Sequence, residues 1–150
     1  TDYQGGQYAY MPGQRATYTM TAEALLCRQY LGWPCDHRGI ETGVEYLLQN
    51  LPHQNKPNIY YWYYGTQVMH HVGGKPWKRW NDKIRVMLTS MQEKQGHEAG
   101  SWDPRGRFAN QGGRLYMTSL AICTLEVYYR HLPLYRKEVL SDLFADANGP

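Results

Sequence analysis

The sequence is poor in the features that mark disulfide-rich or membrane proteins. It has only three cysteines, and an odd number argues against a disulfide framework. We therefore expect reduced thiols and favour a cytoplasmic protein, while the start at Thr1 leaves an exported parent protein open. No run of apolar residues approaches the ~18 needed to cross a membrane, so a transmembrane segment is not expected.

Charge of one sign is also scarce, because the formal net charge of the chain is only +3. The densest basic cluster occupies residues 75–85 and alternates with Trp77, Trp80 and Ile84 at helical spacing. This pattern indicates the solvated face of a helix, since a nucleic-acid footprint is a larger stripe of one sign. We therefore expect no nucleic-acid partner.

Phenylalanine is rare as well, yet the chain holds 14 tyrosines and 5 tryptophans. A tyrosine that is buried needs an apolar contact for its ring and a partner for its hydroxyl. The apolar fraction, 42%, is ordinary for a globular protein, and 150 residues can bury one core. Residues 1–150 are therefore expected to form a single domain.

A repeat runs through the chain. Segments 18–27, 63–71 and 115–125 align on Thr21, Thr66 and Thr118, with a tyrosine shortly before each threonine and aliphatic or Met side chains after it. The threonines lie roughly 50 residues apart, which is the period of stacked supersecondary units.

Each repeat is predicted to contain a buried inner helix and an amphipathic outer helix. The inner segments are apolar on nearly every side, whereas the outer segments have one apolar stripe and a polar opposite face. Glycine and proline separate the segments, and no strand is expected. The predicted fold is all-α, with three inner–outer helical hairpins forming an arc: inner helices at about 16–32, 59–72 and 114–131, outer helices at about 39–51, 76–94 and 134–146.

The loop "QEKQGHEAGSW" carries the most specific motif. Gln92 closes the second outer helix, and Gly100 and Trp102 follow before the third inner helix. Hairpins of this period resemble the α/α-toroid repeats of squalene–hopene cyclases and protein prenyltransferase β-subunits, and poorly characterised bacterial proteins have very similar arrangements. The motif resembles the Gln…Gly-x-Trp signature of that family, which implies that Trp102 stacks on the Gln92 amide and joins two hairpins.

The catalytic residues that the resemblance would imply are absent. Hopene-type cyclases carry an acidic D-x-D-D-T-A segment, but the best match, "TYTMTA", has Thr17, Thr19 and Met20 where the carboxylates would stand. Threonine and methionine are not general acids near neutral pH. The prenyltransferase zinc site needs an Asp-x-Cys that does not occur, so neither a metal nor another cofactor is expected.

A closed toroid needs roughly twice the hairpins found here. An arc leaves apolar surface at its ends and on its concave face. We therefore expect that the chain docks to other parts of a longer parent protein, or that copies associate.

The stretch "YYWYYGTQVMHH" is the candidate binding site. Such aromatic walls with a few polar tips suit an apolar or ring-bearing small molecule. The alternative is an inner helix whose polar groups bond to neighbouring hairpins. The candidate ligand-binding residues are Tyr60, Trp62, Tyr64, Gln67 and His71.

Two smaller clusters complete the candidates. Cys27, Cys35 and His37 lack the paired spacings of a zinc site, so a loop capped by Asp36 is preferred. His71, together with His97 and Asp103 of the 96–104 loop, supplies weak candidates for acid–base catalysis.

Two functions follow. The first is a non-catalytic interaction or hydrophobic-ligand-binding module. The alternative is a divergent α/α-toroid enzyme, terpenoid cyclase-like or carbohydrate-processing, and convergence of His71, His97 and Asp103 at a pocket would favour it.

Overall fold

The computed structural model describes residues 5–106 and 108–130, and it confirms that the fold is all-α. Within these residues the only β feature is an isolated antiparallel bridge between Gln92 and Trp102. The helices are α1 (Tyr18–Tyr30), α2 (Arg38–Gln49), α3 (Ile59–Val72), α4 (Gly74–Met91), α5 (Ala109–Leu125) and the short α6 (Val127–Arg130).

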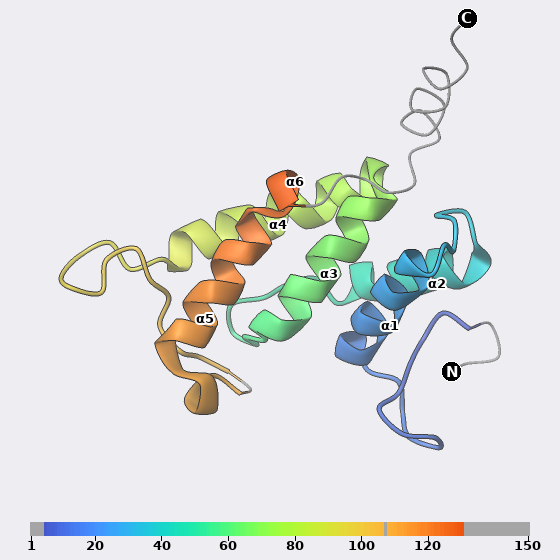
Figure 1. Ribbon diagram of the computed structural model, residues 1–150, viewed down its shortest axis with the longest axis horizontal. Coiled ribbons are helices and arrows are strands. Elements are labelled where there is room, and N and C mark those ends of the chain that lie inside the picture. The colour runs from blue at the N-terminus through green and yellow to red at the C-terminus, as the bar shows by residue number, and fades with distance from the viewer. Residues whose placement is uncertain (1–4, 107, 131–150) are drawn as a thin grey trace, which may run out of the picture.

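The central element is α3, which packs against α1 on one side and α5 on the other. Figure 1 shows these three helices side by side, and α2 and α4 pack against them to form a second layer. The described chain thus contains two pairs of consecutive helices that pack together, α1 with α2 and α3 with α4, followed by α5, which packs on α3. The outer helix expected at 134–146 lies outside the described residues.

The predicted boundaries hold to within a few residues, and the differences have local causes. The second inner helix begins and ends where the sequence placed it, at Ile59 and Val72. The third was expected to start at residue 114, but a helical turn already begins at Ala109. Gly113 interrupts it with φ 66° and ψ −165°, a conformation that glycine adopts at little cost.

Side chains that cap the first turns fix where the helices start. The Thr17 hydroxyl accepts the amide N–H of Met20 at 3.2 Å, and Asn58 accepts that of Tyr61 at 3.1 Å. The preference for Asp36 as the cap of the next helix was wrong. His37 takes that place, because its Nδ1 accepts the amide N–H of Gly39 at 3.0 Å.

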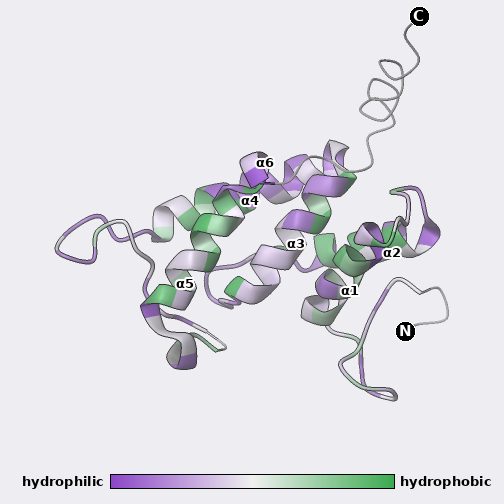
Figure 2. Ribbon diagram, in the orientation of Figure 1, coloured by the Kyte–Doolittle hydropathy of each residue, from purple (hydrophilic) through white to green (hydrophobic). Residues whose placement is uncertain are grey.

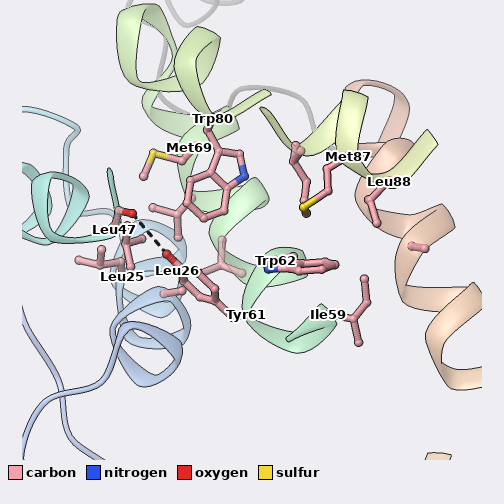
Figure 3. Close-up of a cluster of buried hydrophobic side chains, with 14 of the residues drawn as sticks. Leu25, Leu26, Leu47, Ile59, Tyr61, Trp62, Met69, Trp80, Met87 and Leu88 are labelled. Carbon is pink, nitrogen blue, oxygen red and sulfur yellow. Dashed lines mark hydrogen bonds between the residues drawn. The ribbon is translucent and has the colours of Figure 1, made fainter. Parts of the chain in front are cut away.

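The aromatic core lies where α3 crosses α4. The Trp80 ring is fully buried and lies against Gly65, where a side chain would leave no room for it. Figure 3 shows Trp80 above Tyr61, and it shows Trp62 beside Ile59 on the other side of α3. The Tyr61 hydroxyl donates to the carbonyl oxygens of Leu47 and Asn50 at 3.4 and 2.9 Å, which satisfies the C-terminal end of α2.

The three aligned threonines have a shared role in this core. The Oγ1 of Thr21 accepts the amide N–H of Tyr8 at 3.0 Å, and that of Thr118 accepts the amide N–H of Trp102 at 3.1 Å. The Oγ1 of Thr66 accepts the indole N–H of Trp80 at 2.8 Å. Each of α1, α3 and α5 therefore offers one threonine hydroxyl that accepts a hydrogen bond from an aromatic residue of another segment.

The residues of the Gln…Gly-x-Trp motif lie together at the end of α4. Gln92 is the C-cap of this helix, and its side-chain amide donates to the carbonyl of Gly100 at 2.9 Å. The Trp102 ring is 2% exposed, and its indole N–H donates to the carbonyl of Leu88 at 2.8 Å. Leu88 lies in the last turn of α4, so the indole of Trp102 is attached directly to the C-terminal end of this helix.

Candidate functional site

Three of the four tyrosines of α3 lie away from the side of the helix that packs on α4, whereas Tyr61 packs against Trp80 of α4. Gly65 marks the side that touches Trp80. At about 100° per residue, Tyr60 and Tyr63 lie nearly opposite Gly65, and Tyr64 lies beside Tyr60, about a quarter turn from Gly65. The side of α3 that packs on α4 is thus marked by Gly65, and the other side carries tyrosine. Figure 2 shows the first turns of α3 in pale colours, because tyrosine lies near the middle of the hydropathy scale.

Side chains from α1 and α5 extend this tyrosine surface. On α1 the residues at positions 23, 27 and 30 form a stripe opposite the buried side of that helix. On α5 the ring of Tyr116 lies over Gly112, and its hydroxyl is close enough to that of Tyr64 for the two to interact electrostatically. We call the combined surface the inner face; it comprises Glu23, Cys27, Tyr30, Tyr60, Tyr63, Tyr64, Gln67 and Tyr116.

Ring contacts hold the tyrosines of the inner face in place. The centroids of the Tyr60 and Tyr64 rings are 4.7 Å apart with an interplanar angle of 63°. Those of Tyr63 and Tyr64 are 5.1 Å apart at 76°. Edge-to-face pairs of this kind add to the stability that burial provides. The three rings therefore form an ordered group rather than independent side chains.

Glu23 is the only charged side chain of the inner face. It is half-buried and hydrogen-bonded to the Tyr60 hydroxyl. Removal from water raises the pKa of the Glu23 carboxyl above its ordinary value of 4.5, and the hydrogen bond from Tyr60 opposes this shift. The pKa of the Tyr60 hydroxyl is also raised, by burial first and then by hydrogen bonding to Tyr64 and by the nearby Glu23 charge.

A titration can test this arrangement. We expect the substitution Tyr60→Phe to raise the pKa of Glu23 further, because it removes the hydrogen bond that stabilises the carboxylate. The measurement is an NMR titration of the Glu23 side-chain carboxyl, with Tyr10→Phe as a control far from the carboxylate in sequence and 77% exposed. A lower or unchanged pKa in Tyr60→Phe would contradict the hydrogen bond.

The same shift determines how Glu23 contributes to stability as the pH changes. A carboxyl whose pKa is higher in the folded state binds its proton more tightly there. Protonation of Glu23 therefore stabilises the fold, and this stabilising contribution is fully present below pH 4.5. This contribution is lost as the pH rises through the folded-state pKa. Glu23→Gln is therefore expected to remove a small destabilising contribution at neutral pH, which urea denaturation at pH 4 and 7 can measure.

The structure brings together only some of the ligand-binding residues expected from the sequence. Tyr60 and Tyr64 lie on the inner face. Gln67 lies beneath them and is 3% exposed. Its side-chain oxygen accepts a hydrogen bond from the Tyr30 hydroxyl at 3.3 Å. His71 is buried, and its ring lies 5.8 Å from that of Tyr30. Trp62 lies elsewhere, 1% exposed and in the core.

Five residues of the inner face, Cys27 among them, were not among the predicted ligand-binding residues. Together with Cys27, the residues Glu23, Tyr30, Tyr63 and Tyr116 come from three helices, and only the folded chain brings them together. A signal for two of them was present. Glu23 is the only acidic residue of α1, and Tyr30 follows it at i+7 on the same helical stripe.

His71, His97 and Asp103 do not converge. His71 precedes α4, whereas His97 and Asp103 follow it, and the 18 residues of that helix span about 27 Å. The His97 side chain is 94% exposed and lies 3.9 Å from Glu98. Asp103 pairs with Arg114 and Arg105 at 3.1 and 2.9 Å. The arrangement that would favour an enzyme at these residues is therefore absent.

Arg114 organises the loop that carries these acids. Its guanidinium lies 2.9 Å from Glu98 and 3.1 Å from Asp103, and it donates to the Ser101 hydroxyl at 3.1 Å. Both carboxylates pair with Arg114, which lies in α5. We therefore interpret the 96–104 loop as a structural element that holds the start of α5 in place. This interpretation agrees with the position of Trp102 between them in the chain.

Two open grooves lie beside the loop between α2 and α3, away from the inner face. The larger, of about 490 Å³, is lined by residues that include Tyr18, His53, Tyr61 and Trp62. The smaller, of about 330 Å³, shares His53 and extends to α4. No residue of the inner face lines either groove.

Two general searches of residues 5–106 and 108–130 gave negative results. No group of three or more His, Cys, Asp or Glu side chains in this part of the chain could hold a metal ion. No helix there is both long and apolar enough to cross a membrane.

Comparison with known proteins gave no relative. No family model matches the chain, and neither a curated protein nor a solved structure is significantly similar to it.

Proposed function

We propose that the chain is a non-catalytic binding module, built on repeats like those of terpenoid cyclases and prenyltransferases, whose inner face binds an apolar or ring-bearing ligand. One observation carries the proposal. The neighbouring helices α1, α3 and α5 place five tyrosines, none of them fully buried, on a single surface. Tyrosine supplies large, rigid contact area at low entropic cost, and it is enriched at binding sites.

The wide separation of the candidate acids and bases supports a module over an enzyme. General acid–base catalysis needs its groups within hydrogen-bond reach of one substrate. His71 lies at one end of α4, and Asp103, already paired with arginine, lies beyond the other. A self-association of this module would use the same tyrosine surface, because aromatic side chains are favoured at the centres of protein interfaces.

Native mass spectrometry of the freshly purified chain tests the proposal, because it reports stoichiometry and retained ligand together. We expect either a monomer that carries an additional small mass or a dimer. The variant Tyr64→Leu should lose that mass or that dimer, since it removes the ring that contacts both Tyr60 and Tyr63. The matched control is Tyr10→Leu, a tyrosine that is 77% exposed in the N-terminal loop.

The outcome that contradicts the proposal is equally clear. A monomer without bound mass, identical in the parent chain and in both variants, would mean that the inner face binds nothing in the cell. A bound mass that survives Tyr64→Leu would place the ligand elsewhere, and the groove lined by Trp62 would then be the next site to mutate.

A further inference from the structure

The carboxylate of Glu23 has no cationic partner in the described part of the chain. The ion pairs formed there involve Asp82, Glu98 and Asp103, and none involves Glu23. Its neighbour on the inner face is the neutral hydroxyl of Tyr60. Partial removal from water is costly for a charge that nothing nearby compensates, so a cation beside the Glu23 carboxylate would be favoured.

The arginines of α1, α3 and α5 interact with groups other than Glu23. The helices α1, α3 and α5 contain two arginines, Arg28 and Arg114, and no lysine. The guanidinium of Arg28 lies over the Trp33 ring, 4.6 Å from its centroid, and Arg114 pairs with Glu98 and Asp103. The inner face therefore carries one negative charge that this part of the chain leaves uncompensated.

The uncompensated negative charge of Glu23 favours a positively charged ligand, and the tyrosine rings beside it also attract positive charge. The face of an aromatic ring carries negative electrostatic potential, and a cation within about 6 Å of its centroid is attracted to it. Tyr60 contacts Glu23 directly, and the ring pairs extend from Tyr60 through Tyr64 to Tyr63. Carboxylate and rings thus attract the same sign of charge.

The chemistry of this group favours a weakly hydrated organic cation over a metal ion. Calcium and magnesium need several oxygen ligands, and Glu23 is the only carboxylate of the inner face. A quaternary ammonium, in contrast, loses little hydration when its methyl groups contact ring faces, and one carboxylate balances its charge.

We propose that the ligand of the inner face carries an alkylated ammonium group, which lies against the rings of Tyr60 and Tyr64 beside the Glu23 carboxylate. This inference rests on the proposed function and specifies the class of ligand for the same surface.

The test compares two small molecules that differ in charge and share their shape. Choline has a trimethylammonium group, and 3,3-dimethylbutan-1-ol has a neutral tert-butyl group in its place. Each is titrated into the full chain while the amide chemical shifts of α1, α3 and α5 are followed by NMR. We expect choline to shift the amides around Glu23 and Tyr60 and to bind at least about fivefold more tightly than the neutral alcohol.

Three variants separate a binding role from a structural one. Glu23→Gln should weaken choline binding about tenfold and leave the affinity for the neutral alcohol unchanged. Tyr64→Leu should weaken choline binding about fivefold, and Tyr64→Phe, which keeps the ring, should retain it. Circular dichroism on each variant checks that the fold is intact, and Glu23→Gln is conservative enough to serve if Tyr64→Leu unfolds.

The results distinguish failure of this inference from failure of the proposed function. Equal affinity for both compounds at the inner face, insensitive to Glu23→Gln, would overturn the cation while leaving an apolar binding surface. Absence of shifts with either compound would also overturn the inference, and the mass measurement on Tyr64→Leu then decides the proposed function independently.

Discussion

The substitution Trp102→Ala is expected to destabilise the chain by about 3–5 kcal/mol, the usual cost of truncating a fully buried tryptophan. The ring is 2% exposed, so its removal leaves a cavity between α4 and α5. It also leaves the carbonyl of Leu88 without the indole N–H that satisfies it. Urea denaturation followed by circular dichroism measures the change.

Two further variants make this result specific to Trp102. Trp102→Phe keeps one aromatic ring but loses the indole N–H and part of the buried ring volume, so we expect a cost smaller than that of Trp102→Ala. Trp33→Ala is the matched control, because Trp33 is half-buried and packs on Arg28 and His37 at the surface. A loss of stability in Trp102→Ala no larger than that in Trp33→Ala would refute the role given to the Gln92–Trp102 motif.

The second large effect is expected at the crossing of α3 and α4. Trp80→Ala should cost about 3–5 kcal/mol, because the ring is fully buried and donates to the Thr66 hydroxyl at 2.8 Å. The reciprocal change, Gly65→Ala, should also destabilise, by about 1–3 kcal/mol. A Cβ at position 65 would lie 2.6 and 2.7 Å from two atoms of the Trp80 ring, which cannot move away within a packed core.

The effect of Gly65→Ala on stability should change sign when Trp80 is replaced, and a double-mutant cycle can detect this change. When Trp80 is replaced by leucine, the space beside residue 65 opens, and alanine there becomes the better helix former by about 1 kcal/mol. We therefore expect Gly65→Ala to destabilise the parent chain and to stabilise Trp80→Leu. Additive effects in the cycle would show that the close approach between Gly65 and Trp80 is not what limits this position.

The helices were predictable because their periodicity is local. The apolar stripes of α2 and α4 repeat over three or more turns, and a pattern of that length identifies a helix whatever packs against it. The ends were less predictable, since they depend on single contacts. His37 and Asp36 are both able to cap a helix, and only the folded loop selects His37.

The candidate site was harder to predict than the fold. A run of five aromatic residues does not say which rings face a neighbouring helix, so Trp62 and Tyr64 could not be assigned to opposite sides. Gly65 held the missing information, because a glycine inside an aromatic helix marks the side where another element approaches closely. The partners Glu23 and Tyr116 are too distant in sequence for any local pattern to connect them with α3.

The threonine bonds described above have a consequence for how the chain is made. The three hydrogen bonds of Thr21, Thr66 and Thr118 join residues only 13, 14 and 16 positions apart. Closing such short loops costs little entropy, and chains rich in local contacts fold rapidly. Each bond can form once its own segment has left the ribosome, so early hairpins can be stabilised while later ones are still being synthesised.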